Sequence, residues 1–146
     1  MLLADSNVWL ALALSKHAFH ATVRAWFARQ KPSQPVLFCR STQQSFLRLL
    51  TTSAVLAPYG IPPLSNKAAW SAFEGFRTDK RISWANEPRG LEAQWKKLAS
   101  GAKPSPKLWM DAYLAAFAMA GEYQMVSTDT AFKQFKGLDL IVLSKS

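Results

Sequence analysis

The sequence predicts an α/β fold in which helices flank a central, mainly parallel sheet of about four to five strands. Short apolar segments of strand length recur along the chain, and segments with helical periodicity separate them. Strands buried on both faces have this apolar character, and helical crossovers between them favour parallel pairing. With 146 residues, 49% of them hydrophobic, the chain can bury one core, so we expect a single domain over residues 1–146.

Five short apolar segments predict the strands of this sheet. The first ends at Asp5, Ser6 and Asn7, whose side chains favour turns and helix N-caps. The predicted strands cover residues 2–4, 36–39, 82–84, 124–127 and 138–143.

Apolar residues spaced at the helical period predict helices between these strands. They are expected at residues 8–14, 17–30, 41–50, 68–76, 88–98, 106–120 and 129–135. Ser41 and Gln44 fit a capping box at the start of the third helix. Pro106 is expected to begin the long helix, and Gly121 is its expected C′ residue. Residues 53–65 carry three prolines and one glycine and predict a loop.

The chain is strongly basic, because 18 Lys and Arg residues oppose 9 Asp and Glu residues, which gives a net charge of +9. A small domain with such a charge usually meets a polyanion, which can be nucleic acid, an anionic membrane surface or an acidic protein. The single cysteine, Cys39, excludes an internal disulfide framework and a cysteine-based zinc site. The chain does not open with the basic segment of a signal peptide, and no stretch of about 18 residues is apolar throughout. We therefore expect a cytoplasmic protein.

Three of the nine acidic residues occupy positions that suit chemistry. Asp5 follows the first predicted strand, Asp129 follows the fourth, and Asp111 lies in the first turns of an apolar helix. Because ligands bind at the carboxyl ends of parallel strands, we expect these carboxylates at one edge of the sheet. Asp5 and Asp129 also suit a simpler role as helix N-caps.

Three converging carboxylates without cationic partners would repel one another strongly. Two unit charges about 4 Å apart cost about 4 kcal/mol at an effective dielectric constant of about 20. Such a site takes up protons or binds a hard cation. Mg²⁺ and Mn²⁺ suit carboxylate oxygens and keep waters that a phosphate can displace. The sequence therefore predicts a divalent-metal site.

Several segments resemble one known family, in the order in which they occur there. Residues 3–9, Leu-Ala-Asp-Ser-Asn-Val-Trp, are similar to the opening of PIN-domain ribonucleases. Further blocks resemble the VapC toxins of bacterial toxin–antitoxin pairs: the His17-x-x-His20-x-x-Val23-x-x-Trp26-Phe27 pattern, residues 40–51, residues 106–115, and Val-Ser-Thr-Asp-x-x-Phe at residues 126–132. The resemblance covers essentially the whole chain.

This resemblance implies a PIN-like fold and an endoribonuclease that depends on Mg²⁺ or Mn²⁺. It implies that Asp5, Asp111 and Asp129 hold the cation, which would activate a water for in-line attack on an RNA phosphodiester. Ser6 and Thr128 are expected to support the carboxylates or the substrate through hydrogen bonds. The implied partners are a cognate VapB-type antitoxin and a second copy of the chain in a homodimer.

One position departs from the family pattern. The family usually places a glutamate where this chain has Gln43, three residues before Phe46. An amide can still ligate a metal or hold a water, but it carries no charge and cannot act as a base. Gln43 equally suits the role of an ordinary polar residue in a first helical turn. The departure keeps open a second function, a non-cleaving RNA-binding or interaction module with a degenerate site.

The stretch from Arg77 to Lys107 carries eight basic residues against three acidic ones. It is either a solvated face or a track for the RNA backbone that leads to Asp111, and we favour the track. The residues expected to form it are Arg89, Lys96, Lys97, Lys103 and Lys107.

The six tryptophans divide into two groups. Four fall on apolar helical stripes and are predicted to be structural: Trp9, Trp26, Trp70 and Trp109. Trp84 and Trp95 lack a clear stripe and are candidates for stacking on bases as well as for structural roles.

Overall fold

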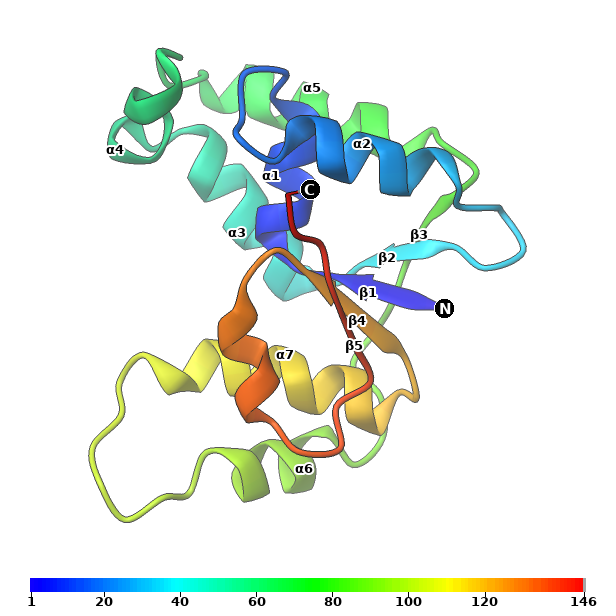
Figure 1. The fold of residues 1–146 in the computed structure, drawn as a ribbon, viewed down its shortest axis with the longest axis vertical. Helices are drawn as coiled ribbons and strands as arrows, with labels where there is room; N and C mark the ends of the chain where they lie inside the picture. Colours follow the sequence, from blue (N-terminus) through cyan, green and yellow to red (C-terminus); the bar gives the residue numbers. More distant parts are fainter. Residues whose placement is uncertain (146) are drawn as a thin grey trace.

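The computed structural model describes residues 1–145, and its central feature is one sheet of five parallel strands (Figure 1). The strands are β1 (Leu2–Ala4), β2 (Val36–Phe38), β3 (Ile82–Trp84), β4 (Gln124–Ser127) and β5 (Leu140–Val142). Their spatial order is β3-β2-β1-β4-β5, and every neighbouring pair is parallel. The predicted α/β class with a parallel central sheet is confirmed.

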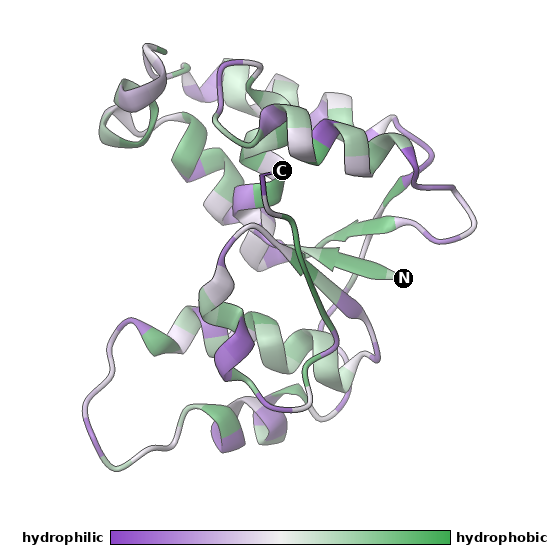
Figure 2. Cartoon of the chain, viewed as in Figure 1, coloured by the Kyte–Doolittle hydropathy of each residue, from purple (hydrophilic) through white to green (hydrophobic). Residues whose placement is uncertain are grey.

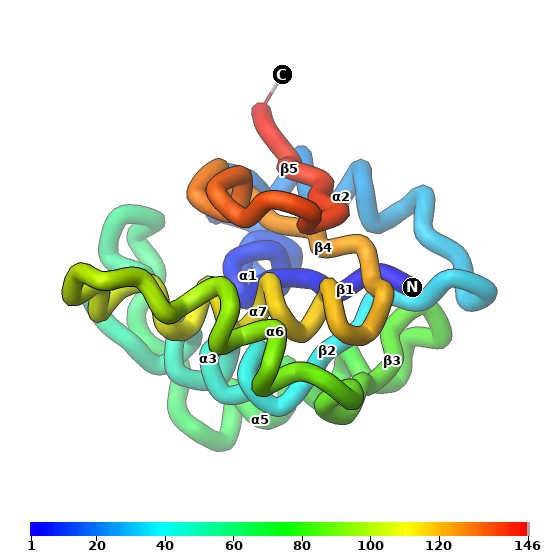
Figure 3. The backbone as a smooth tube through the Cα atoms, turned by 90° about the horizontal axis from the view of Figure 1, so that it is seen from below, coloured from blue at the N-terminus to red at the C-terminus, as the bar shows by residue number. Residues whose placement is uncertain are grey.

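Helices cover both faces of the sheet. The α-helices are α1 (Ser6–Ala13), α2 (His20–Ala28), α3 (Arg40–Leu50), α4 (Ser53–Leu56), α5 (Asn66–Arg77), α6 (Leu91–Leu98) and α7 (Leu108–Ala120), and the 3₁₀ helices are η1 (Ala57–Tyr59) and η2 (Thr130–Gln134). Figure 1 shows α1 to α5 on one side of the sheet and α6 and α7 on the other. Seen from below, α6 and α7 again lie side by side (Figure 3). In the described part of the chain, no helix combines the length and the apolar character needed to cross a membrane.

Alternate residues of each strand belong to two separate hydrophobic cores. Leu2 and Ala4 pack with α1, α2, α3 and α5, whereas Leu3 packs with α7 on the opposite face. In β4, Val126 belongs to the first core and Met125 to the second. This alternation follows from the two-residue period of a strand. Because both faces of the sheet are covered by helices, neighbouring strand residues that face opposite cores are both apolar. Figure 2 shows β1 and β2 in the green of hydrophobic residues.

An aromatic cluster holds α1 against the sheet. Trp9 is 1% exposed and stacks on Phe38 of β2, with ring centroids 3.8 Å apart and an interplanar angle of 11°. Phe73 of α5 meets Phe38 edge-on at 5.0 Å. Aromatic pairs of this kind contribute about 0.5–1.5 kcal/mol beyond the apolar area that they bury. Because Asp5 directly precedes α1, this packing also positions that carboxylate.

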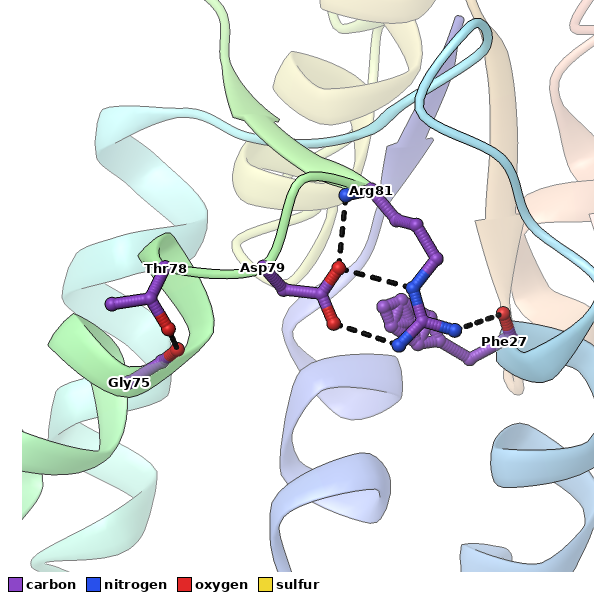
Figure 4. Close-up of polar contacts among 5 residues, drawn as sticks. All are labelled: Phe27, Gly75, Thr78, Asp79 and Arg81. Carbon is purple, nitrogen blue, oxygen red and sulfur yellow. Dashed lines mark hydrogen bonds and ion pairs between the residues drawn. The ribbon is translucent and has the colours of Figure 1, made fainter.

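An ion pair fixes the turn that leads into β3 (Figure 4). The backbone N–H and Nε of Arg81 donate to Oδ1 of Asp79 at 2.9 and 3.0 Å, and Nη2 donates to Oδ2 at 2.7 Å. Hydrogen bonds from Arg81 lower the pKa of Asp79. The guanidinium also lies over the Phe27 ring, 4.1 Å from its centroid. Because residues 79–81 precede β3, this pair lies at the amino edge of the parallel sheet.

The start of α3 differs from the predicted capping box. β2 ends at Phe38, so Cys39 becomes the N-cap, and α3 begins at Arg40. The hydroxyl of Thr42, three residues after the cap, accepts a hydrogen bond from the Cys39 N–H at 2.9 Å. The predicted box of Ser41 and Gln44 is therefore wrong, because the strand ends earlier than the pattern suggests. Cys39 itself is buried in the core, as expected.

Gly121 ends α7 as predicted, but not because it adopts a left-handed conformation. Gly121 has an ordinary φ of −87°, and the left-handed residue is Glu122, with φ 57°. Gly121 is needed for space, since a Cβ built there would overlap the ring of Tyr123. At the other end, Pro106 lies in a turn and α7 begins at Leu108.

The segment predicted as a loop contains α4 and η1. Pro58 lies in the first turn of η1, where the missing N–H breaks no helical bond, and Gly60 ends that helix with φ 68°. The prolines and the glycine therefore shorten the helices here without abolishing them.

Two of the four tryptophans predicted to be structural are exposed. Trp9 and Trp26 are buried as predicted, at 1% and 5% exposure. Trp70 and Trp109 are 47% and 54% exposed, so the prediction is wrong for these two. The fully buried residues of α7 all lie between Ala112 and Ala118, so Trp109 in its first turn stays exposed.

Candidate functional site

The carboxyl ends of β1 and β4 lie next to each other at one edge of the sheet. The parallel register pairs Ala4 with Val126, and the Asp5 N–H donates to the Val126 carbonyl at 2.9 Å. The residue after β1, Asp5, therefore stands beside the last residue of β4, Ser127. Two segments far apart in the sequence thus meet where the fold class leads one to expect a ligand site.

Asp5 is a buried carboxylate held by two hydroxyls. The residue is only 6% exposed. Ser127 Oγ donates to Oδ2 at 2.9 Å, and Ser6 Oγ lies 3.4 Å from Oδ1. Asp5 occupies the N-cap position of α1, but its side chain makes no capping hydrogen bond. Its Oδ2 instead accepts the hydrogen bond from Ser127 at the end of β4.

Ser127 is the residue that sequence reasoning missed. Its Oγ donates to Asp5 and accepts a hydrogen bond from the Asp129 N–H at 2.9 Å, so one hydroxyl joins both acidic segments. The sequence signal that could have found it is a serine that ends an apolar strand and stands two residues before Asp129. Of the two predicted supporting residues, Ser6 contacts Asp5, whereas Thr128 is half-buried and makes no side-chain hydrogen bond within residues 1–145.

Asp129 caps the helix that follows it. Its Oδ1 accepts a hydrogen bond from the Ala131 N–H at 2.9 Å, which is the N-cap geometry of η2. The simpler role considered for this residue is therefore real. A carboxylate has further lone pairs, so capping leaves Asp129 able to bind a second group.

Asp111 lies in the first turn of α7 and is half-buried. It lines a hollow of about 590 Å³ together with Ala131 and Gln134 of η2. The helix that covers the sheet thus brings the third aspartate toward the segment that begins with Asp129.

The charges of the three aspartates act on one another. Burial raises the pKa of Asp5 to about 6; hydrogen bonds from the Ser127 hydroxyl and from the Ser6 backbone N–H oppose the rise, and the negative charges of Asp111 and Asp129 add to it. Burial, and then the charge of Asp129, raises the pKa of Asp111. The three carboxylates therefore form one electrostatic group.

This group fits a divalent cation in its chemistry. Its donors are carboxylate oxygens, and in residues 1–145 the ion pair between side chains, Asp79 with Arg81, lies at the other edge of the sheet. Within that part of the chain, none of the three aspartates forms an ion pair with a basic side chain. In that same part of the chain, no three His, Cys, Asp or Glu side chains are close enough together to enclose an ion. The arrangement is a coupled acidic group that a cation would draw together.

Gln43 is placed under a guanidinium. It is buried, and its Oε1 accepts a hydrogen bond from Arg40 Nη1 at 2.5 Å. Arg40 also lies over the Trp84 ring, 4.7 Å from its centroid, and Arg77 lies over the same ring at 5.5 Å. The amide oxygen that could ligate a metal therefore faces a positive charge. The ring of Trp84, a candidate for base stacking, is therefore already in contact with two guanidinium groups.

The predicted basic track is exposed along its whole length. Lys96 and Lys103 line a hollow of about 820 Å³ between α6 and the start of α7. Lys107 lines the Asp111 hollow. Arg89 and Lys97 are exposed outside both hollows.

The parallel sheet and the acidic group at its carboxyl edge agree with a family comparison. The PIN domain family model matches residues 2–138, and the chain belongs to this family. Within the family, the chain is 54% identical over 146 residues to Ribonuclease VapC41 of Mycobacterium tuberculosis strain H37Rv, an alignment that covers 99% of this chain and all of that protein.

Solved structures show the same fold. The VapC20 toxin of Mycobacterium tuberculosis, described as cleaving the sarcin–ricin loop, superposes with a TM-score of 0.67 at 17% identity, covering 95% of this chain and 98% of that one. VapBC-1 from nontypeable Haemophilus influenzae gives a TM-score of 0.68 at 12% identity, covering 99% of this chain and 98% of that one. The predicted PIN-like architecture is thereby confirmed.

Proposed function

We propose that this protein is a metal-dependent endoribonuclease, the toxin of a VapBC-type toxin–antitoxin pair, which hydrolyses RNA phosphodiesters. The observation that carries the proposal is the buried Asp5 carboxylate, coupled to Asp111 and Asp129; within residues 1–145, none of these three carboxylates forms an ion pair with a basic side chain. The 54% identical relative named as a ribonuclease supports the reaction class.

In this proposal, Asp5, Asp111 and Asp129 hold Mg²⁺ or Mn²⁺. The bound cation would activate a water and neutralise charge that develops on the phosphate. Ser127 and Ser6 fix the Asp5 carboxylate, and the Ser127 hydroxyl fixes the backbone at Asp129. Such supporting hydrogen bonds orient the oxygens that face the cation. Gln43, engaged by Arg40, is assigned no ligand role.

The exposed lysines supply the affinity for the RNA backbone. Lys107 lies beside Asp111 in one hollow, and Lys96 and Lys103 extend the positive charge along the neighbouring one. Each phosphate of a single strand that a lysine neutralises steepens the dependence of log affinity on log salt by about 0.7. Reversing the charge of Lys96 and Lys103 should therefore weaken RNA binding and make the slope of log affinity against log salt shallower. The metal affinity should not change.

We also propose a VapB-type antitoxin and a second copy of this chain as partners. The structural likeness to VapBC-1 from nontypeable Haemophilus influenzae supports the antitoxin. The side chain of Met110 is 58% exposed and provides apolar surface next to Asp111 in the sequence.

The test is cleavage of total RNA by the purified protein in Mg²⁺, in Mn²⁺ and in EDTA. We expect cleavage with either metal, none in EDTA, and loss of cleavage in Asp111→Asn, whose half-buried position tolerates an amide. Asp79→Asn, at the opposite edge of the sheet, is the matched control and should cut like the wild type. Equal cleavage by wild type and Asp111→Asn would refute the proposal. RNA binding without cleavage in any metal would favour the non-cleaving module.

A further inference from the structure

Two tryptophans line a hollow of about 820 Å³ between α6 and the start of α7. Trp95 of α6 and Trp109 of α7 meet edge-on, with ring centroids 6.2 Å apart and an interplanar angle of 81°. We call this pair the aromatic slot. The hollow of about 820 Å³ lies within the size range of small-molecule sites. Trp109 is 54% exposed, which is unusual for an indole at the start of the helix that forms the second core.

The slot is held rigid from behind. Trp95 Nε1 donates to the Trp109 carbonyl at 3.0 Å, so the indole N–H is satisfied within the protein. The Trp95 ring also meets Tyr113 edge-on at 5.5 Å, and the Tyr113 hydroxyl donates to Glu87 Oε1 at 2.8 Å. Because these contacts fix the Trp95 ring before a ligand binds, little side-chain entropy is lost on binding.

The walls of the hollow suit a flat apolar group that carries negative charge. Leu108, Pro104 and Pro106 give apolar surface, and the exposed ammonium groups of Lys96 and Lys103 stand against a single acid, Glu92. A nucleotide combines an aromatic base with a phosphate, whereas an apolar protein segment would leave the lysines without partners. Charge complementarity therefore favours a nucleic acid strand as the occupant.

The hollow continues into the acidic site. Ser105, Pro106 and Leu108 line both the slot hollow and the neighbouring hollow that contains Asp111 and Lys107. A base bound in the slot would therefore hold the adjoining backbone near the carboxylate group.

We propose that the aromatic slot binds one unstacked nucleobase of single-stranded RNA and so sets which phosphate is presented to the acidic site. The proposal rests on the proposed function, because it assigns the substrate contact of that same site. Trp109 is a positioning residue here: its exposed ring stacks on the base, while Lys96 and Lys103 contact the flanking backbone.

The experiment measures RNA affinity in EDTA, so that binding is separated from cleavage. The probes are short fluorescein-labelled oligoadenylate and oligouridylate, together with versions that carry one abasic position at each site in turn. Trp109→Leu should weaken binding about tenfold, and Trp109→Tyr should retain most of the affinity because it keeps a stacking ring. Trp70→Leu, which removes a similarly exposed indole from α5 on the other side of the sheet, should bind like the wild type.

The abasic series provides the decisive comparison. One abasic position should weaken binding to the wild type, and that penalty should disappear in Trp109→Leu, since the two changes remove the same stacking interaction. Equal affinity of Trp109→Leu and wild type for every probe overturns the slot, as does absence of RNA binding by the wild type. If Trp109→Leu instead alters only the mass measured by light scattering, the surface is a contact between copies of the chain, and the slot is again overturned.

Cleavage assayed separately in Mg²⁺ tells the two proposals apart: a wild type that cuts while Trp109→Leu binds normally refutes the slot alone. A wild type that shows the abasic penalty but never cuts refutes the endoribonuclease alone.

Discussion

Replacing Asp5 by asparagine should stabilise the metal-free protein at neutral pH. The pKa of Asp5 is raised from 3.8 to about 6, chiefly by burial and further by the charges of Asp111 and Asp129. At about 1.4 kcal/mol per pH unit, the ionised carboxylate lowers the free energy of unfolding by about 3 kcal/mol above pH 6. Asparagine removes this charge, and its Oδ1 can still accept the hydrogen bond from Ser127.

The pH window follows from proton binding in the two states. Between about pH 4 and pH 6, the folded chain retains a proton on Asp5 that the unfolded chain has already released. The stability of the wild type therefore falls as the pH rises through this window. Below about pH 4 both states are protonated, so the advantage of Asp5→Asn should vanish there. Asp111, whose pKa is also raised, contributes with the same sign in the wild type and in the variant.

Urea unfolding in EDTA, followed from pH 4 to pH 8, measures this effect. Asp5→Asn should gain about 3 kcal/mol at pH 8, and the two curves should converge toward pH 4. Asp79→Asn is the control of opposite sign: it removes a surface ion pair and should lose at most about 1 kcal/mol at neutral pH. Added Mn²⁺ should stabilise the wild type more than Asp5→Asn. A variant no more stable than the wild type at pH 8, or a gain independent of pH, would show that the reasoning is wrong.

Two further substitutions test local packing and the position that departs from the family. Gly121→Ala should lower the free energy of unfolding by about 1–3 kcal/mol, because its Cβ would overlap the Tyr123 ring. Gly75→Ala, with open space at its Cβ position in α5, should raise the free energy of unfolding by up to about 1 kcal/mol. Urea unfolding measures both. Gln43→Glu should pair with Arg40 and change the Mn²⁺ affinity by less than about threefold in calorimetric titration; a tenfold gain would place the new carboxylate with the aspartates.

The order of helices and strands was predictable because its signals are local. Leu2–Ala4, Ile82–Trp84 and Gln124–Ser127 are strands at the predicted bounds, since short apolar segments between helical patterns leave few alternatives. One error was the segment 53–65, predicted as a loop, which contains α4 and η1. The other errors fell at helix ends. There the outcome depended on where the neighbouring strand stopped, as at Cys39, or on a side chain two residues away, as at Gly121.

The acidic residues were identifiable for a different reason. Acids are scarce in this chain, and a parallel sheet brings the residues that follow its strands to one edge, so Asp5 and Asp129 could be placed there before the fold was known. Their electrostatic coupling with Asp111 agrees with that placement. Whether each carboxylate acts on RNA is what the cleavage experiment decides.

The sequence by itself predicted the fold class, because the hydrophobic period is set by neighbouring residues, and it placed Asp5 and Asp129 directly after their strands. The resemblance of its motifs to PIN-domain ribonucleases indicated the family. Only the tertiary structure paired Ser127 with Asp5 across 122 positions, since that contact depends on strand register. Only the tertiary structure shows that Arg40 donates a hydrogen bond to the Gln43 side-chain oxygen, and that Trp109 is exposed beside a hollow. These outcomes depend on which faces of the helices are covered, and packing between distant segments decides that.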